Sequence, residues 1–257
     1  MDGLEPVADV SVGDWIADRL GGPLGSVGSV VPDGLRGLCP RPAPGGVRRR
    51  PSTADVVAGR ELTGRVPHAL MQWAAVASPA SGAATWDEGD VRVGNLAPAA
   101  LAALIDVLAP FTGEQDCFHA LWEGWGWVDG RGVRIFSVSD DGRVEPARVP
   151  EPGVSAEVRA LPRLRLPDRD HLLFRGPLRA ALDMGWHESP LGFEPQSTPA
   201  CCAGRRSWCV GAEIDFDSTL VGGSRGLIAA VLARRILGPR WPVQPRRLTT
   251  SGASARP

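Results

Sequence analysis

Glycine and proline interrupt this chain so often that only one segment keeps a helical pattern of useful length. Of the 257 residues, 32 are Gly and 24 are Pro, and both are unfavourable inside helices and central strands. The exception begins at Pro98, which suits the first turn of a helix. Its apolar residues recur at helical spacing: Leu101, Leu104, Ile105 and Leu108. The rest of the chain is therefore expected to fold from short elements.

The other elements follow from local signals. Short helices are predicted at 11–20 with Ser11 as N-cap, at 178–184, and at 227–236 after the cap residue Ser224. Strands are predicted at 117–127, 133–139, 171–175 and 207–217, and a strand or short helix at 66–77. Strands and helices mix without regular alternation, which favours an α+β fold: one domain over 1–245, with a mainly antiparallel sheet and three or four helices. A disordered polar tail is expected at 246–257.

Charge and cysteine content argue against several classes of protein. The chain carries 28 basic residues, all Arg, and 29 acidic ones, which gives no electrostatic support for a nucleic-acid or membrane-surface binder. No apolar run approaches the roughly 18 residues of a membrane span, and the acidic start lacks the features of a signal peptide. The chain has five cysteines, an odd number, and no C-x-x-C pair, which argues against a disulfide framework and against a zinc site. A soluble cytoplasmic protein is expected.

Codon bias explains much of the unusual composition. The chain has no Lys and no Tyr, and Asn95 is its single Asn. These residues have A/T-rich codons, whereas Ala, Gly, Arg and Pro have G/C-rich ones. The bias is typical of a GC-rich genome such as that of an actinobacterium, and it carries no information on function.

Three segments resemble an uncharacterised family of actinobacterial hypothetical proteins. They are PHALMQW (67–73), LWEGWGW (121–127) and the block 166–224, which contains LPDRDHLLFRGPL, GFEPQS and SWCVGAEIDFDSTLVGGS. The likeness spans residues 11–244. It implies no established activity, cofactor or partner.

The chain departs from the family pattern in two places. In the first, 39–44 reads CPRPAP where the family has a sequence like YARVLHP. A shifted reading frame converts a coding sequence for the family segment into one for CPRPAP. A second shift near 51–53 restores the family reading frame. We therefore expect 39–53 to be irregular and translated out of frame, which would make the run Arg48-Arg49-Arg50 accidental. Sequencing the gene and those of its nearest relatives tests this hypothesis. Relatives that carry CPRPAP in an intact reading frame would overturn it. A similar but weaker case exists at 198–206, which includes Cys201 and Cys202.

The acidic segment EIDFD is the sharpest candidate for chemistry. On a strand, Glu213, Asp215 and Asp217 would project from one face and Ile214 and Phe216 from the other. Three carboxylates on one face could hold Mg²⁺ or Mn²⁺. The structural alternative, a half-buried strand whose acidic face is solvated or paired with Arg, is the commoner origin of such alternation.

Arg175 precedes a predicted helix in LLFRGPL, where it could bind a carboxylate or phosphate. It could equally form a structural ion pair with Asp215 or Asp217.

Trp122, Trp125 and Trp127 flank glycines in LWEGWGW, so their rings could form a binding platform or line a corner of the core. Glu123 beside them could have a raised pKa, but no partner for it is evident.

The four histidines show no metal-ligand or catalytic spacing. They are His68, His119, His171 and His187. The family pattern has Tyr at the position of His171, which argues against catalysis there. No nucleophile elbow, phosphate-binding loop or dinucleotide fingerprint occurs.

Two functions remain. The favoured one is a non-catalytic binding or interaction module that uses Trp122, Trp125, Trp127 and Arg175, without a cofactor, for a protein or small-molecule partner. The alternative is a hydrolase or transferase that holds Mg²⁺ or Mn²⁺ with Glu213, Asp215 and Asp217 and clamps an anion with Arg175.

Overall fold

The computed structural model describes residues 1–23, 26–35, 37–42, 93–131, 143, 151–167, 169–189, 192–202 and 206–234. The elements expected at 66–77 and 133–139, the tail at 246–257 and the arginine run at 48–50 lie outside these ranges.

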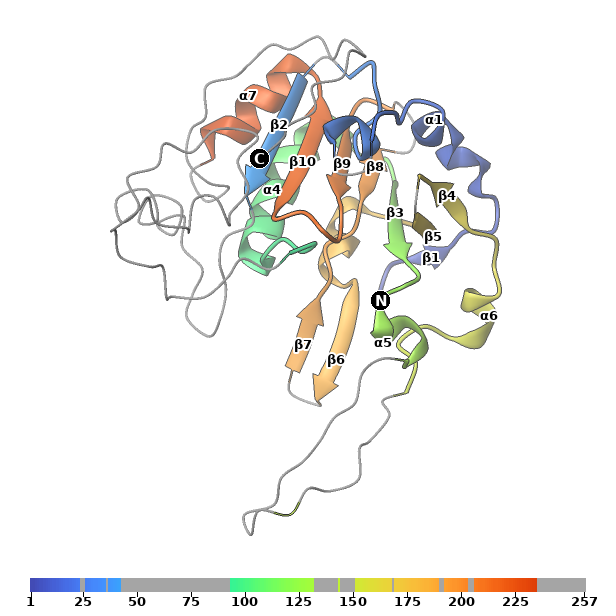
Figure 1. Ribbon diagram of the computed structural model, residues 1–257. Coiled ribbons are helices and arrows are strands. Elements are labelled where there is room, and N and C mark those ends of the chain that lie inside the picture. The colour runs from blue at the N-terminus through green and yellow to red at the C-terminus, as the bar shows by residue number, and fades with distance from the viewer. Residues whose placement is uncertain are drawn as a thin grey trace, which may run out of the picture.

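An eight-stranded sheet dominates the described part of the chain (Figure 1). Its strands are β1 (Glu5–Pro6), β2 (Gly37–Pro42), β3 (Cys117–Trp122), β4 (Leu164–Leu166), β5 (Arg169–Gly176), β8 (Ala200–Cys202), β9 (Cys209–Ala212) and β10 (Ser218–Gly223). They follow the order β1-β5-β3-β8-β9-β10-β2, with β4 also paired to β5, and every pairing is antiparallel. A separate hairpin joins β6 (Gly185–Ser189) to β7 (Gly192–Pro195).

Short helices connect these strands. The α-helices are α1 (Asp14–Ala17), α4 (Pro98–Thr112), α5 (Gly126–Asp129), α6 (Ala156–Arg159) and α7 (Arg225–Ala233). The 3-10 helices are η1 (Val10–Gly13), η2 (Val27–Ser29) and η3 (Leu178–Leu182). The α+β fold with a mainly antiparallel sheet is therefore confirmed.

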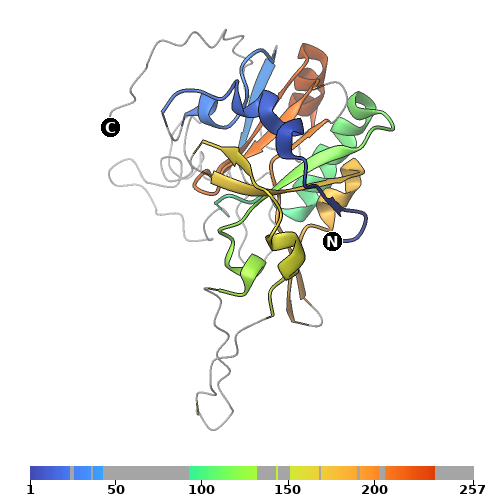
Figure 2. The ribbon, with the colours of Figure 1, turned by 90° about the vertical axis from the view of Figure 1, so that its right-hand side faces the viewer.

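The largest core lies between the sheet and the two longest helices. α4 and α7 cover one face of the sheet, while α1 lies over the other (Figure 2). All four apolar residues expected on the buried stripe of α4 are buried. At the end of α4, the indole of Trp208 donates to Thr112 Oγ1 at 3.1 Å, which ties the helix to the start of β9.

The helix caps agree only partly with the sequence. Ser224 caps α7 as predicted, since its hydroxyl accepts from the backbone N–H of Leu227. Near the N-terminus, however, the cap is Asp9 and not Ser11, because the Asp9 carboxylate accepts from both the backbone N–H and the hydroxyl of Ser11. The helical segment therefore begins at Val10, as η1, and continues into α1. Trp15 in α1 is buried, as its spacing predicted.

A strand occupies the start of the stretch expected to be irregular. β2 pairs along its whole length with β10, from Gly37 opposite Gly223 to Pro42 opposite Ser218. β2 is an edge strand, and edge strands tolerate proline. Pro40 and Pro42 are two residues apart, so both lack an N–H on the same side of the strand. A proline-rich sequence can therefore still extend the sheet at its edge.

The long strand expected at 207–217 does not form. β9 ends at Ala212 and β10 begins at Ser218, and the two strands pair antiparallel around an intervening turn. Within this turn the N–H of Phe216 donates to the carbonyl of Glu213 at 3.0 Å. Similarly, the strand expected at 117–127 ends at Trp122 and is followed by a turn and α5.

Within the described ranges, none of the helices has both the length and the apolar character needed to cross a bilayer.

Candidate functional site

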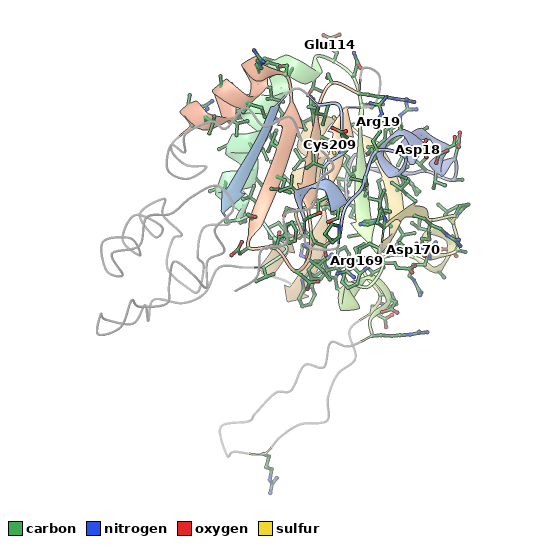
Figure 3. All side chains as sticks on the ribbon, turned by 45° about the horizontal axis from the view of Figure 1, so that its top comes forward. Asp18, Arg19, Glu114, Arg169, Asp170 and Cys209 are labelled. Atoms are coloured by element: carbon green, nitrogen blue, oxygen red, sulfur yellow. The ribbon has the colours of Figure 1, made fainter. Side chains whose placement is uncertain are left out.

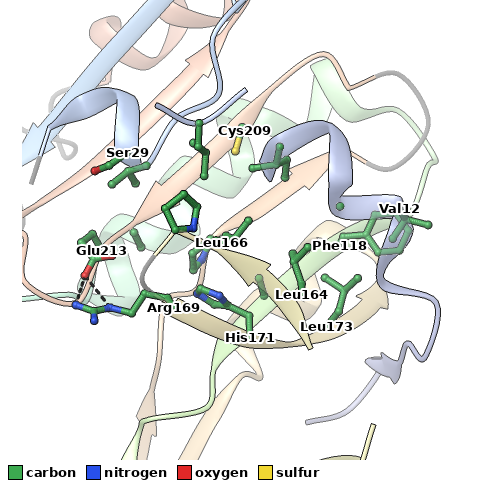
Figure 4. A pocket seen from close by; sticks show the side chains of 18 residues that line it. Val12, Ser29, Phe118, Leu164, Leu166, Arg169, His171, Leu173, Cys209 and Glu213 are labelled. Carbon is green, nitrogen blue, oxygen red and sulfur yellow. Dashed lines mark hydrogen bonds and ion pairs between the residues drawn. The ribbon is translucent and has the colours of Figure 1, made fainter. Parts of the chain in front are cut away.

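The main cavity is an apolar pocket on the α1 face of the sheet (Figure 4). The pocket is open to solvent on one side. Its floor comes from β3, β4, β5 and β9 and its roof from η1, α1 and η2. The apolar lining includes Val12, Ile16, Leu20, Phe118, Leu164 and Leu173. We call this cavity the apolar pocket.

Strand alternation and register explain why these residues meet. Phe118 and Ala120 point to the same face of β3 because they are two residues apart. Antiparallel pairing places Ala120 opposite Leu173 and Trp122 opposite His171 on β5. Directly opposed residues share a face, so β5 adds Leu173 and His171 to the same side of the sheet.

The roof approaches the floor closely at one end. A Cβ added to Gly13 would lie 2.5 Å from a methyl carbon of Leu164, so η1 packs onto β4 with no room for a side chain. Further along the roof, Trp15 and Ile16 of α1 pack in one cluster with Cys209 of β9. The roof therefore contacts the floor at both β4 and β9.

A smaller polar recess adjoins the apolar pocket. The two cavities share six residues, among them Ala120, Arg169, His171 and Glu213. The recess adds the rings of Trp122 and Trp125 and the backbone segment that carries Ser197 and Thr198. We call it the polar recess.

Hydrogen bonds from the single asparagine hold the wall of the polar recess. The Asn95 side chain donates to the carbonyl of Pro195 at 2.8 Å and accepts from the N–H of Ser197 at 2.7 Å. The Ser197 hydroxyl in turn accepts from the N–H of Leu96 at 2.7 Å. These bonds fix the chain on either side of Gln196 and so position Thr198 against the sheet.

Two buried polar groups in the recess have no hydrogen-bond partner among the described residues. They are Nδ1 of His171 and Oγ1 of Thr198, and both side chains are more than nine-tenths buried. Burial lowers the pKa of His171 to about 4, so the imidazole is neutral at pH 7. A neutral imidazole offers one donor and one acceptor nitrogen.

Arg169 lies where the two cavities meet and is engaged by the acidic turn. Its guanidinium contacts Glu213 at 2.9 Å and Asp215 at 2.8 Å, and it lies 5.2 Å from the centre of the Trp122 ring. Figure 3 shows Arg169 beside Asp170, at the opposite end of the sheet from Glu114. This group of one cation and two carboxylates has a net charge of −1.

The expectation of three carboxylates on one strand face is therefore wrong. Glu213 and Asp215 lie in the turn between β9 and β10 and converge on a guanidinium, and Asp217 follows them just before β10. Alternation on a strand does not apply to a turn, where successive side chains take other directions. Within the described ranges, no three His, Cys, Asp or Glu side chains are grouped closely enough to hold a metal ion.

Arg175 has a different partner from those considered. It forms an ion pair with Asp116 at 2.9 Å, and both side chains are about half exposed. The arginine that meets Glu213 and Asp215 is Arg169, at the other end of β5. Arg175 and Arg169 are six residues apart and lie near opposite ends of the eight-residue strand β5.

The three tryptophans divide between core and recess. Trp127 is 5% exposed and packs in a core cluster with Leu121 and Met184. Trp122 and Trp125 are partly exposed and meet edge to face, with ring centres 5.5 Å apart. Only these two line the polar recess. Glu123, between them, forms an ion pair with Arg163 at 2.7 Å, a partner that the sequence did not reveal.

The remaining histidines do not join the site, whereas Cys209 lines the apolar pocket from β9. His119 is fully buried on β3 and lines neither cavity. His187 is exposed on the β6–β7 hairpin, 5.1 Å from the ring of Phe193. Cys117 and Cys209 are both buried, and burial raises the pKa of Cys209 to about 12, so the Cys209 thiol is not reactive at neutral pH. His68 lies outside the described residues.

Sequence reasoning missed Arg169, Thr198 and the apolar pocket. A signal for Arg169 existed, since it lies two residues before His171, where the strand predicted at 171–175 begins. The strand in fact starts at Arg169, so the two side chains share a face. The pocket itself had no sequence signal, because its roof and floor come from segments at least 88 residues apart, the separation between Val30 and Phe118.

Comparison of the chain with protein-family models, with curated proteins and with solved structures finds no match. The site must therefore be interpreted from its own geometry.

Proposed function

We propose that this protein is a non-catalytic binding module of the cytoplasm that takes a small, largely apolar molecule into the apolar pocket. The observation that carries the proposal is the pocket itself, a concave space between the sheet and the η1–α1 segment that is lined mainly by apolar side chains. Small-molecule sites are typically concave and predominantly apolar.

The charges around the pocket favour an uncharged ligand. Arg169 is already engaged by Glu213 and Asp215, so it offers little to an anion such as a phosphate or a nucleic-acid backbone. The same engagement weakens the alternative of a metal-dependent hydrolase, since two of its three carboxylates are occupied by an arginine.

A neutral dye tests the proposal directly. N-phenyl-1-naphthylamine fluoresces strongly in apolar surroundings, and we expect it to bind the wild-type protein saturably with a stoichiometry near one. Ala212 lines both cavities at the end of β9. Ala212→Leu places three more carbon atoms there and is expected to weaken dye binding at least tenfold.

The matched control is Ala102→Leu. Ala102 is also partly buried but lies on α4, and it lines neither cavity. We expect this variant to bind the dye like the wild type. Absence of saturable binding in wild-type protein with a cooperative melt, or equal affinity in both leucine variants, would contradict the proposed site.

A further inference from the structure

Resting on the proposed function, we infer that the ligand of the apolar pocket carries one uncharged hydroxyl group, which hydrogen-bonds to His171 and Thr198 in the polar recess. The inference names the ligand class: an apolar body with a neutral polar head, in which the hydroxyl both donates and accepts.

Two buried polar groups without a partner in the described part of the chain line the polar recess. Buried polar atoms almost always have a hydrogen-bond partner, and one without a partner costs about 1–3 kcal/mol. Nδ1 of His171 and Oγ1 of Thr198 are both buried without a partner among the described residues. They line the same recess although they come from different segments, β5 and the chain before β8.

The polar recess is continuous with the apolar pocket. His171 and Pro199 line both cavities, so the recess opens from the wall of the pocket. The imidazole of His171 points from β5 into the pocket (Figure 4). A ligand whose apolar body fills the pocket therefore presents its end to these groups.

The charged groups beside the polar recess favour a neutral head group on the ligand. Glu213 and Asp215 with Arg169 leave a net charge of −1 beside the recess, which repels a carboxylate. Arg169 covers the Trp122 ring at 5.2 Å, so that aromatic face is not offered to a cationic head. A neutral hydroxyl avoids the repulsion and satisfies both side chains.

Displacement of the bound naphthylamine dye by a matched set of compounds tests the inference. Propylbenzene, 4-propylphenol and 4-propylbenzoate share an apolar body and differ in the head group. At pH 7 we expect the phenol to displace the dye at about fivefold lower concentration than propylbenzene, which corresponds to a net gain of about 1 kcal/mol. The benzoate is expected to be the weakest of the three.

Two variants locate the hydroxyl. Thr198→Val keeps the side-chain shape and removes the unpaired hydroxyl, so it should fold at least as well as the wild type and bring the phenol and propylbenzene within twofold of each other. His171→Phe removes both ring nitrogens on β5 and should likewise reduce the preference for the phenol over propylbenzene. Thr219→Val, on β10 and lining neither cavity, is the control and should retain the preference.

The outcomes separate this inference from the proposed function. Equal displacement by propylbenzene and the phenol in wild-type protein would overturn the hydroxyl assignment and leave the apolar pocket intact. A preference that survives in both Thr198→Val and His171→Phe, or tightest binding of the benzoate, would also overturn it. If the dye itself does not bind, the proposed function fails, and this inference fails with it.

Discussion

Two neutral histidines are buried on opposite faces of the same sheet. His119 points with Leu121 toward the α4 side, and His171 points with Leu173 toward the α1 side, because their strands pair in antiparallel register. Burial lowers the pKa of each to about 4, from the usual value of 6.5. Both are therefore buried in the form that carries no charge.

The free energy of unfolding should consequently fall on mild acidification. Each histidine binds its proton near pH 6.5 in the unfolded chain but only near pH 4 in the folded one, so the unfolded state gains protons between these values. The stability is fully present above about pH 6.5 and is lost as the pH falls toward 4. Between pH 7 and pH 5, each histidine should lower the free energy of unfolding by about 2 kcal/mol.

Urea unfolding at pH 7 and pH 5 measures this loss. His171→Gln, which does not titrate, should show about half of the wild-type difference between the two pH values. A wild-type protein that is equally stable at both would show that the histidines are not buried as neutral groups.

At the scale of the element, the turn between β9 and β10 depends on one arginine. Glu213 is 12% exposed and Arg169 18% exposed, so removing the guanidinium leaves a nearly buried carboxylate without its partner. Arg169→Met keeps an unbranched apolar side chain and removes the guanidinium. We expect it to lower the free energy of unfolding by about 2–3 kcal/mol.

Arg175→Met is the matched control on the same strand. Its ion pair with Asp116 is about half exposed on both sides, and exposed pairs contribute less than about 1 kcal/mol. Urea unfolding of both variants at pH 7 compares them. Equal losses would mean that the turn is not held by Arg169.

The turn also shapes the recess through one glycine. Gly94 has φ of +70°, a conformation that side chains disfavour, and its N–H donates to the carbonyl of Phe216 at 2.8 Å. An added Cβ would lie 2.6 Å from the Cα of Ile214. The chain before α4 is thus pressed against the turn, and glycine alone permits this contact.

Across the whole molecule, the two faces of the sheet differ in how completely they are packed. The α4–α7 face holds the largest core, in which Leu227 is 1% exposed. The α1 face holds the apolar pocket, where Leu20 borders empty space and is only partly buried. Truncating a leucine side chain should therefore lower the free energy of unfolding more on the α4–α7 face than on the α1 face.

We expect Leu227→Ala to lower the free energy of unfolding by about 3 kcal/mol and Leu20→Ala by less than about 1.5 kcal/mol. Chemical denaturation at pH 7 measures both. A saturating apolar ligand should raise the melting temperature of the wild type by mass action. A larger loss in Leu20→Ala would indicate that the roof segment is part of the main core.

Local pattern determined the elements whose signals lie within a few residues of one another. The helical spacing of apolar residues after Pro98 predicted α4, and the cap residue Ser224 predicted the start of α7. The irregular mixture of short strands and helices predicted the antiparallel α+β class. The cap at Asp9 shows the limit of this reasoning, since two neighbouring polar residues competed for one helix start.

Only the tertiary structure decided the site. EIDFD has the alternation of a strand, yet pairing of β9 with β10 requires a turn there, and Arg169 engages its carboxylates from 44 residues earlier in the chain. The apolar pocket joins Val12 and Leu173, and the recess joins Trp122 and Thr198. Local propensity acts over a few residues, whereas such contacts depend on strand register and packing between distant segments, which a single sequence does not display.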